Sequence, residues 1–532
     1  MSSTQRFTLP PSGLDSTPSE RWCAEGHGFI QTDHARRSPA QHTRHEVRDC
    51  SPWPIDAEAG QRYIAPESAE RLRSLAAHWL KPFEHSGVRE EELMPRLGYN
   101  RSHCDRKSPS RICPLVMVQR GEIFVYIPYT SRLFPERLPS CRHLSGDSPG
   151  GASMRRLLHI LRFMRSTLSK LWWWNRKDFA VRVCVDEFCH GVFEDRPLPW
   201  FTMISCLPTP SLPAVQWNTL KGRDPNLSEW DQLLLDQAEL WRVANASWHC
   251  RIDRAVWRGS ASEPFSTNMR WTSNRTLERL PITKGRWKSQ GRLALVWQHC
   301  IHPMLLDVHM RGLQGANPGV GKNLISDPQY KGCVAKLGVH KQKVLSLAQQ
   351  ARAYRYLIHV EGVGGWADRL KHLLLSHAVV IKQDMGVREW FEPLFHPFVH
   401  YVPVSSKLIN VSNAVRWLRK HDARAQAIAR AASRQATEVF SVAAMSIYME
   451  ALILGYARLY RDSQGVAGLL ERLPQDQVVK FDCGWKRSAD GNRTYDCSFF
   501  HRKAGKPIDS VMDAAMLDGS TEATQPRRAG WC

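Results

Sequence analysis

Apolar positions along the chain predict strands that alternate with helices between about residues 179 and 404. The stretch 179–188, FAVRVCVDEF, alternates and is rich in β-branched residues, which predicts a strand ending in two carboxylates. Helical spacing of apolar residues follows at 366–377. Further strands are predicted at 201–207, 255–257, 356–362, 378–382 and 400–404. Strands separated by helices predict an α/β protein with parallel sheets.

Flanking segments add helices and one strand. A helix is predicted at 66–80, with proline at its first position, and a strand at 122–129. Residues 154–174 form an apolar stripe beside several arginines, which predicts a core helix with a solvated basic face. A helix lying on a membrane surface is the alternative there. From 407 to 460 the pattern is helical and rich in alanine.

The polarity of the segments predicts four regions. Residues 1–58 are rich in Ser, Pro, His and Arg and are predicted to be disordered. We expect an N-terminal domain at 59–250, a C-terminal domain with terminal helices at 251–460, and an irregular tail at 461–532. The most apolar stretches are broken by polar residues, so no membrane span is predicted.

Charge and cysteine content narrow the function classes. Lys and Arg outnumber Asp and Glu by 73 to 51, a formal charge of +22 that favours polyanions, including phosphate-bearing donors. The basic residues form no long run, and no nucleic-acid-binding motif accompanies them, so no nucleic-acid partner is expected. The 14 cysteines show no zinc-type spacing, and no metal site is predicted. Cys104/Cys113 and Cys483/Cys497 are candidate disulfides, with free thiols as the alternative.

The segment 351–404 has the pattern of a phosphate-binding unit. Gly364 and Gly365 lie between a predicted strand and a helix, where the backbone turns sharply and exposes N–H groups. Arg369 follows in the first turn of that helix, from which a guanidinium can bind two phosphate oxygens. The turn predicts a diphosphate site, with glycines kept only for packing as the alternative.

Five pieces of this segment occur in a recognisable order. They are Tyr354-x-Tyr356-Leu357, a glycine-containing turn, RLKHLL at 369–374, Glu389–Trp390–Phe391, and HYVPV at 400–404. This order resembles the C-terminal core of glycosyltransferase family 90, which contains protein O-glucosyltransferases and capsule xylosyltransferases. Upstream, AVWRGSAS at 255–262 and VDEF at 185–188 are similar to two further motifs of the family.

The resemblance implies a fold and a reaction. Two Rossmann-like domains would face a cleft in the GT-B arrangement, with the acceptor-side domain at 59–250 and the nucleotide-sugar-binding domain at 251–460. The reaction would be an inverting, metal-independent transfer of glucose or xylose from a uridine diphosphate (UDP) sugar to a protein or glycan hydroxyl, with no cofactor besides that donor. Asp186 would be the base, ahead of Glu187. The donor would be bound by residues of two motifs: Arg258, Gly259, Ser260, Gly364, Gly365, Trp366 and Arg369.

The sequence leaves open both the cellular compartment of the protein and whether it is an active enzyme. The resemblance implies the endoplasmic reticulum or Golgi lumen, but the chain shows no signal peptide or retention motif, so a cytosolic enzyme is the alternative. Phe188–Cys189–His190 departs from the proline that usually follows the family's catalytic carboxylates. A lapsed member that only binds glycan or nucleotide is therefore the alternative function, with a basic nucleic-acid-binding protein less favoured.

Overall fold

The computed structural model describes the residues that form two sheets and the helices around them. The described ranges are 64–93, 113–126, 152–171, 177–185, 196–206, 209–215, 248–260, 269–271, 277–279, 291–310, 327–337, 345–362, 367, 369–461, 465–475, 478–481, 483–487 and 493–497.

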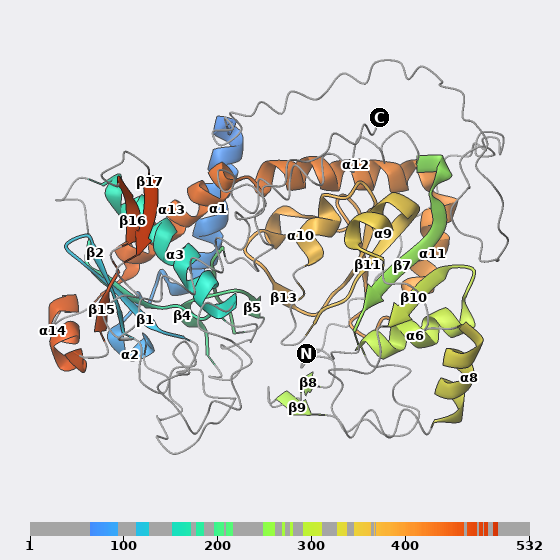
Figure 1. Cartoon of the computed structure of the whole chain (residues 1–532), viewed down its shortest axis with the longest axis horizontal. Helices are drawn as coiled ribbons and strands as arrows, with labels where there is room; N and C mark the ends of the chain where they lie inside the picture. The colour runs from blue at the N-terminus through green and yellow to red at the C-terminus, as the bar shows by residue number, and fades with distance from the viewer. Residues whose placement is uncertain are drawn as a thin grey trace.

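A five-stranded parallel sheet forms the centre of the right-hand half of Figure 1. Its strands are β7 (Ile252–Gly259), β10 (Leu306–Met310), β11 (Tyr354–His359), β12 (Val379–Gln383) and β14 (Val402–Val404). They lie in the order β10-β7-β11-β12-β14, and every neighbouring pair is parallel. By position in the chain this is the order 2-1-3-4-5 of a doubly wound sheet, whose direction reverses between β7 and β11. The predicted α/β class with a parallel sheet is confirmed.

Helices cover both faces of this parallel sheet because its strands are apolar on both sides. On β11, Tyr356 and Ile358 belong to one apolar cluster and Leu357 belongs to another. The first cluster includes α6 (Gly291–Ile301), α8 (Pro328–Leu337) and α11 (Val411–Lys420), and the second includes α9 (Leu347–Ala353) and α10 (Arg369–Leu374). Helix α12 (Asp422–Val439) contributes to both clusters.

A second sheet is antiparallel. Strands β1 (Leu115–Gln119), β2 (Glu122–Tyr126), β3 (Phe179–Arg182) and β15 (Val478–Lys480) lie in the order β15-β2-β1-β3. Arg120 and Gly121, both with positive φ, join β1 to β2 in a two-residue hairpin turn. Beside β3, β4 (Leu198–Thr202) pairs in parallel with β6 (Ser211–Pro213). A second Rossmann-like sheet, and with it the GT-B arrangement, is thus not confirmed in the described part of the chain.

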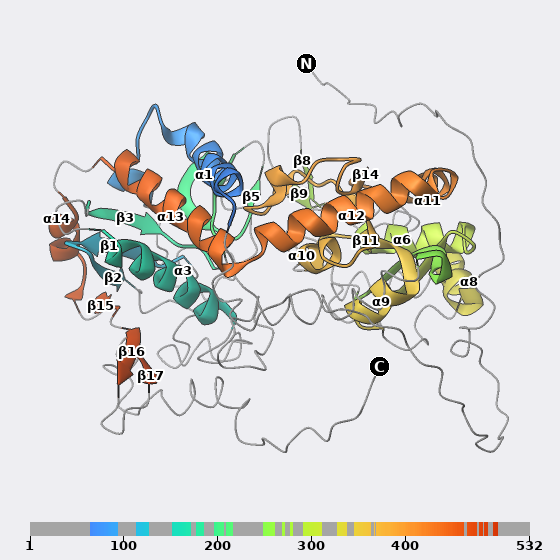
Figure 2. The same ribbon diagram turned by 90° about the horizontal axis from the view of Figure 1, so that it is seen from above.

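The chain returns to the antiparallel sheet after it has completed the parallel one. Helix α13 (Val442–Leu459) packs against α1 (Pro66–Leu80) and α3 (Ala152–Ser169). The Tyr456 hydroxyl donates to the Ala180 carbonyl at 2.9 Å, and the Tyr448 hydroxyl donates to the Pro213 carbonyl at 2.6 Å. Figure 2 shows α12 and α13 running in succession from one half of the molecule to the other. The division of the chain into regions at 1–58, 59–250, 251–460 and 461–532 stays a prediction.

Helix α3 has the orientation expected of a core helix. Leu157, Leu161 and Met164 from its apolar stripe are fully buried in the core of the antiparallel-sheet half. Arg156 Nη1 donates to the Val185 carbonyl at 2.9 Å, and Arg165 Nη1 donates to the Phe481 carbonyl at 3.2 Å. Because this stripe is covered by protein, core packing is confirmed and the membrane-surface alternative for this helix is not.

Shorter elements complete the described structure. The remaining helices are η2 (Lys81–Phe83), α2 (Glu90–Leu93), η7 (Trp248–Cys250), η10 (Glu392–Leu394) and α14 (Gly465–Arg472). The remaining strands are β5 (Ser205–Cys206), β8 (Met269–Trp271), β9 (Leu277–Arg279), β13 (Val387–Arg388), β16 (Cys483–Arg487) and β17 (Arg493–Cys497). Among all described residues no single helix is long and apolar enough to cross a membrane, although α12 and the 443–459 part of α13, bent by 64°, pass this test as a pair.

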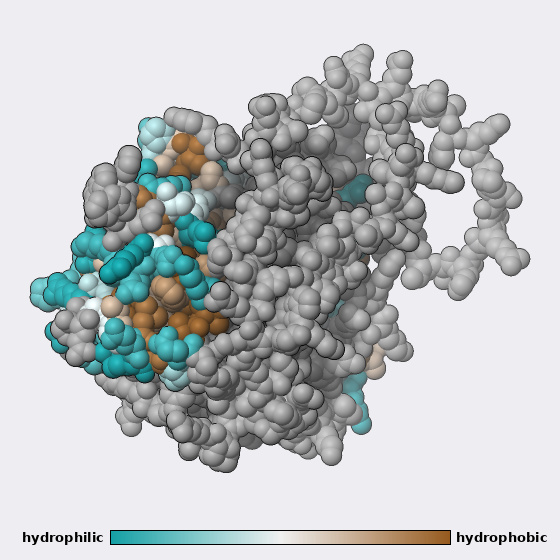
Figure 3. All heavy atoms as spheres, turned by 60° about the vertical axis from the view of Figure 1, so that its left-hand side comes forward, coloured by the Kyte–Doolittle hydropathy of each residue, from teal (hydrophilic) through white to brown (hydrophobic). Residues whose placement is uncertain are grey.

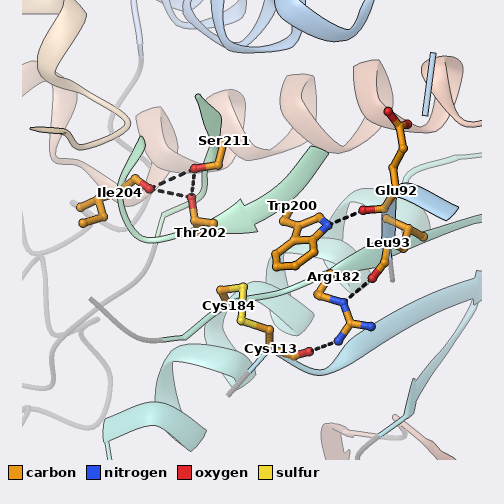
Figure 4. Close-up of a disulfide and its surroundings, with 9 residues drawn as sticks. All are labelled: Glu92, Leu93, Cys113, Arg182, Cys184, Trp200, Thr202, Ile204 and Ser211. Atoms are coloured by element: carbon orange, nitrogen blue, oxygen red, sulfur yellow. Dashed lines mark hydrogen bonds between the residues drawn. A yellow bond between two sulfur atoms is a disulfide. The ribbon is translucent and has the colours of Figure 1, made fainter. Parts of the chain in front are cut away.

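Among the described residues, one disulfide lies in each half of the molecule. Cys113 is bonded to Cys184, which ties the start of β1 to the residue two places after β3 (Figure 4). The predicted Cys104/Cys113 pair is therefore wrong. Cys300 is bonded to Cys333 and links α6 to α8. Cys483 and Cys497 lie opposite each other across β16 and β17, but their side chains are outside the described part, so that pairing stays a prediction.

Beside the Cys113–Cys184 disulfide, Arg182 is almost completely buried. Its guanidinium donates to the carbonyls of Leu93 and Cys113 at 2.5 and 2.7 Å and lies 5.5 Å from the ring centre of Trp200 (Figure 4). These contacts fix the end of β3. On the surface of this half, polar side chains surround apolar ones in the described part of the face in Figure 3.

Candidate functional site

The carboxyl end of the parallel sheet gathers charged residues where the strand order reverses. Strand β7 ends at Arg258–Gly259, followed by Ser260, and the neighbouring β11 leads into Glu361. Arg369 opens α10, and Arg292 lies in the first turn of α6. In doubly wound sheets, ligands bind outside the carboxyl ends of the strands at this switch point. We therefore consider this edge the candidate site.

Arg369 and Arg292 contact the same indole ring. Each guanidinium carbon lies 5.6 Å from the ring centre of Trp257, which is fully buried. Arg369 Nη1 donates to the Arg258 carbonyl at 2.9 Å, and Arg292 Nη1 donates to the Ser260 carbonyl at 3.1 Å. Cation–π contact and backbone acceptors thus fix both guanidinium groups against the end of β7.

Burial disfavours the charged form of Arg292 and Arg369. The pKa of Arg292 is lowered to about 9, mainly by burial and also by the charge of Arg369, while the charge of Glu361 acts in the opposite direction. Burial likewise lowers the pKa of Arg369 to about 10, against the charge of Glu361. Within the described residues, Arg369 forms no ion pair with a carboxylate. A bound anion would offset this effect of burial, because an opposite charge favours the protonated form.

Gly259 leaves the room that this arrangement needs. A Cβ at position 259 would lie 2.5 Å from Cζ2 and 2.9 Å from Cη2 of Trp257, and 3.2 Å from Nη2 of Arg369. Contacts under 3.0 Å force a shift of the neighbouring atoms, and the indole is locked in the core. Glycine is therefore the residue that fits here, which gives the predicted Arg258–Gly259–Ser260 motif a physical reason.

The side chain of Arg258 contacts Asp307, and its predicted role in donor binding stays a prediction. Its Nη2 lies 3.0 Å from Asp307 Oδ1, and its Nη1 donates to the Asp307 carbonyl at 2.7 Å. Asp307 also accepts from His309 Nε2 at 2.9 Å and from the Tyr354 hydroxyl. Burial raises the pKa of Asp307, but these donors outweigh burial and hold it well below its usual range. The guanidinium of Arg258 is thus an internal anchor, while its carbonyl orients Arg369.

Glu361 is a member of the site that the sequence analysis missed. Its Oε1 lies 3.0 Å from His359 Nε2, and its backbone N–H donates to Gln383 Oε1 at 3.1 Å. Gln383 in turn donates to the Ser406 carbonyl at 2.6 Å. The carboxylate is buried and held by His359, and its negative charge acts on both arginines.

Arg292 was also missed, and a local signal could have found it. It lies in the first turn of an otherwise apolar helix, where the helix dipole disfavours a cation. A basic residue in that position indicates a partner outside the helix. Glu361 lacked such a signal, because it follows a strand that is apolar in any α/β core.

Four of the predicted site residues lie outside the ranges that the structure describes. Asp186, Gly364, Gly365 and Trp366 fall outside the described residues. Val185, which precedes Asp186, is buried next to the disulfide-bonded Cys184. No group of three or more His, Cys, Asp or Glu that could hold a metal ion occurs in the described ranges.

Comparison with known proteins gives one family and several partial relatives. Residues 320–487 match the model of glycosyl transferase family 90. The chain is 31% identical over 139 residues to protein O-glucosyltransferase 2 of Danio rerio, an alignment that covers 26% of the chain and 28% of the relative. It is 27% identical over 124 residues to protein O-glucosyltransferase 3 of Homo sapiens, covering 23% and 24%. It is 32% identical over 105 residues to protein O-glucosyltransferase 1 of Mus musculus, covering 20% and 26%.

The matches span about a quarter of these relatives' own length. The family match contains β11, Arg369 and Glu361, whereas Arg258 and Arg292 precede it. Both findings support a glycosyltransferase and confirm the resemblance seen in the ordered motifs at 351–404. Residues 320–487 are therefore similar to glycosyl transferase family 90.

Proposed function

We propose that this protein transfers a glucosyl or xylosyl group from a UDP-sugar to a hydroxyl group of a protein. The observation that carries the proposal is the pair of guanidinium groups of the buried Arg292 and the partly buried Arg369, both held against Trp257 at the switch point of the parallel sheet. The family match and the names of the partial relatives support the reaction class and a protein acceptor. A glycan hydroxyl is the alternative acceptor.

The diphosphate of the donor would lie between the end of β7 and α10. Charge-assisted hydrogen bonds from guanidinium groups are the stronger ones in proteins, and they strengthen as negative charge grows on the leaving UDP. This charge supply supports a metal-independent reaction. Gly364, Gly365 and Trp366 would complete the phosphate side of the site, as their motif implies.

Asp186 would act as the base in an inverting step. Its carboxylate would take the proton of the acceptor hydroxyl while that oxygen forms the new bond to the anomeric carbon. The bond from the anomeric carbon to the UDP oxygen would break, and UDP would leave with its electron pair. In the GT-B arrangement that we propose, Asp186 would face the donor from the antiparallel-sheet half.

The two disulfides support a lumenal location. Cys113–Cys184 and Cys300–Cys333 each join separate elements of the fold. Disulfides form and persist in oxidising compartments and are rare in the cytosol. We therefore favour the endoplasmic reticulum or Golgi lumen over a cytosolic enzyme.

The test is UDP release from a panel of UDP-sugars, with and without acceptor proteins. Wild type is compared with Asp186→Ala, Arg369→Gln and the control Arg352→Gln, whose side chain is exposed on α9. We expect one or two sugars to be turned over, with loss of turnover in the first two variants only. Binding of UDP without turnover of any sugar in the presence of acceptors would instead favour the lapsed, binding-only member. Absence of UDP binding would contradict both.

A further inference from the structure

The outer sides of helices α11 and α12 carry a run of exposed cations. Arg416, Lys420, Arg424, Arg430 and Arg434 are exposed, and we call them the α11–α12 basic face. None of the five forms an ion pair with a carboxylate among the described residues. Arg416 contacts Asn413 and His302, Arg424 stacks on Trp417, and Arg430 reaches Gln426.

Acids are few along the same two helices, and both are engaged elsewhere: Glu438, near the end of α12, is partly buried and pairs with Arg71 at 3.0 Å. Over residues 411–434 the one acidic residue is Asp422, which is partly buried. Asp422 accepts from Trp248 Nε1 at 2.9 Å and lies 3.4 Å from Arg355 Nη1. It is thus engaged on the inner side, and the basic face keeps its full charge.

The remaining exposed positions on α12 are small. Ala423 and Ala427 lie between the arginines, whereas Ile428, Ala429 and Ala432 point into the core. At 3.6 residues per turn, Arg424, Arg430 and Arg434 all fall within about 60° of Ala427. Small residues between long basic ones let a flat, extended anionic surface approach all the cations together.

Exposed aliphatic side chains lie next to this face. Ile301, the last residue of α6, is 45% exposed, and Met304, in the segment that links α6 to β10, is 74% exposed. This segment is attached to α11, because Arg419 Nη2 donates to the Met304 carbonyl at 2.8 Å and Arg416 Nη2 lies 3.4 Å from His302 Nδ1. Single exposed aliphatics are common, but here they adjoin a concentrated positive charge.

We propose that the α11–α12 basic face, with Met304 and Ile301, docks the protein on an anionic lipid bilayer. The positive charges complement acidic headgroups, and the aliphatic tips enter the boundary of the acyl chains. Nucleic acid offers phosphates but no apolar layer for Met304 and Ile301. The face lies on the side of α12 away from the sheet, so docking leaves the carboxyl edge of the sheet open to donor and acceptor.

The experiment is cosedimentation of the full chain with vesicles of phosphatidylcholine alone and with 30% phosphatidylserine added. We compare wild type with the triple variant R424Q/R430Q/R434Q and with the control R73Q/K331Q/R458Q, which removes three exposed cations from other helices. Binding to the anionic vesicles is expected to fall by roughly 100-fold in the first variant, since each cation near the surface contributes about a factor of five. The control should lose much less.

Two further measurements make the outcome decisive. Wild-type binding should fall steeply between 0.1 and 0.5 M salt, and Met304→Ser should weaken it several-fold. Equal losses in the two triple variants, or no binding to anionic vesicles by wild type, would overturn the proposal. So would an unchanged Met304→Ser variant, or tighter binding to single-stranded RNA than to the vesicles, since either outcome assigns the face to another polyanion. Thermal denaturation identifies a misfolded variant by its lower melting temperature. UDP release tests the proposed donor site independently of vesicle binding.

Discussion

The indole of Trp257 occupies the space that a side chain at Gly259 would need. A Cβ there would stand 2.5 Å from Cζ2 of the indole, which is buried and cannot move away. The backbone of β7 therefore folds closely over the ring that also supports Arg292 and Arg369. The end of β7 and the two arginines of the candidate site therefore contact the same core side chain.

Gly259→Ala should weaken both the fold and the site. The extra methyl group overpacks the core, which typically costs 1–3 kcal/mol, and pushes the indole or the Arg369 guanidinium out of place. We expect a melting temperature lower by a few degrees and at least tenfold weaker UDP binding, measured by thermal denaturation and calorimetry. Gly332→Ala is the control, since no atom lies within 4 Å of a Cβ there. Unchanged UDP affinity in Gly259→Ala would show that UDP binding does not depend on the position of the Trp257 indole.

Arg369→Gln should reduce UDP affinity with little change in stability. A hydrogen bond to a charged group contributes about 1.5–3 kcal/mol, which corresponds to a loss of roughly 10- to 100-fold. Arg369→Lys keeps the charge but loses the fixed fork that reaches both the Arg258 carbonyl and a phosphate, so it should recover only part of the affinity. Calorimetric titration with UDP measures both variants. Full recovery in the lysine variant would show that charge alone is required.

Asp307→Asn should destabilise the fold by about 3–5 kcal/mol, because it leaves the buried Arg258 guanidinium without its counter-ion. Urea denaturation measures the loss. Glu450→Gln is the matched control, since its ion pair with Lys170 is exposed and contributes at most about 1 kcal/mol. If Asp307→Asn left stability unchanged but abolished UDP binding, Arg258 would have a direct role toward the donor.

Acid should destabilise the protein partly through His299. Burial lowers the pKa of this histidine to about 4, with His309 and Arg254 adding to the effect and the Val308 carbonyl and Asp307 opposing it. The unfolded chain, with a pKa near 6.5, then binds a proton that the folded one does not. Stability from this group is present above pH 6.5 and is lost as the pH falls toward 4, by up to about 3 kcal/mol.

The measurement is urea denaturation of wild type and His299→Gln at pH 7 and pH 4.5. The glutamine variant should lose less stability between the two pH values than wild type does. His78→Gln, at an exposed position on α1, should follow wild type. An identical pH dependence in wild type and His299→Gln would show that other groups carry the acid sensitivity.

Local pattern predicted the parallel-sheet half well. Strands β11 and β12 and helix α10 lie where the apolar spacing and the ordered motifs at 351–404 placed them, because neighbouring residues decide their periodicity. Strand β1 was missed although all of its residues but the last are buried. Its link to β2 is only two residues long, and Arg120 adopts a positive φ that its residue type does not suggest.

The sequence pattern could not predict which distant segments pair with each other. Strand β15 pairs with β2 although more than 350 residues separate them, and periodicity carries no information about such a partner. The same holds for the site. Arg369 was found through its motif, but the direction of the Arg258 side chain depends on Asp307, 49 residues later in the chain. Arg292 reaches the site through a helix that the sequence analysis did not assign.

The return of α13 to the antiparallel sheet sets an order for folding during synthesis. The core of the half that is made first includes Tyr448, Leu452 and Tyr456, which leave the ribosome only after the whole parallel sheet. The nascent chain must therefore keep Phe179, Phe201 and their apolar neighbours without their final partners until translation is nearly finished. Exposed apolar surface of this kind is what chaperones bind, so the half encoded first is the one that matures last.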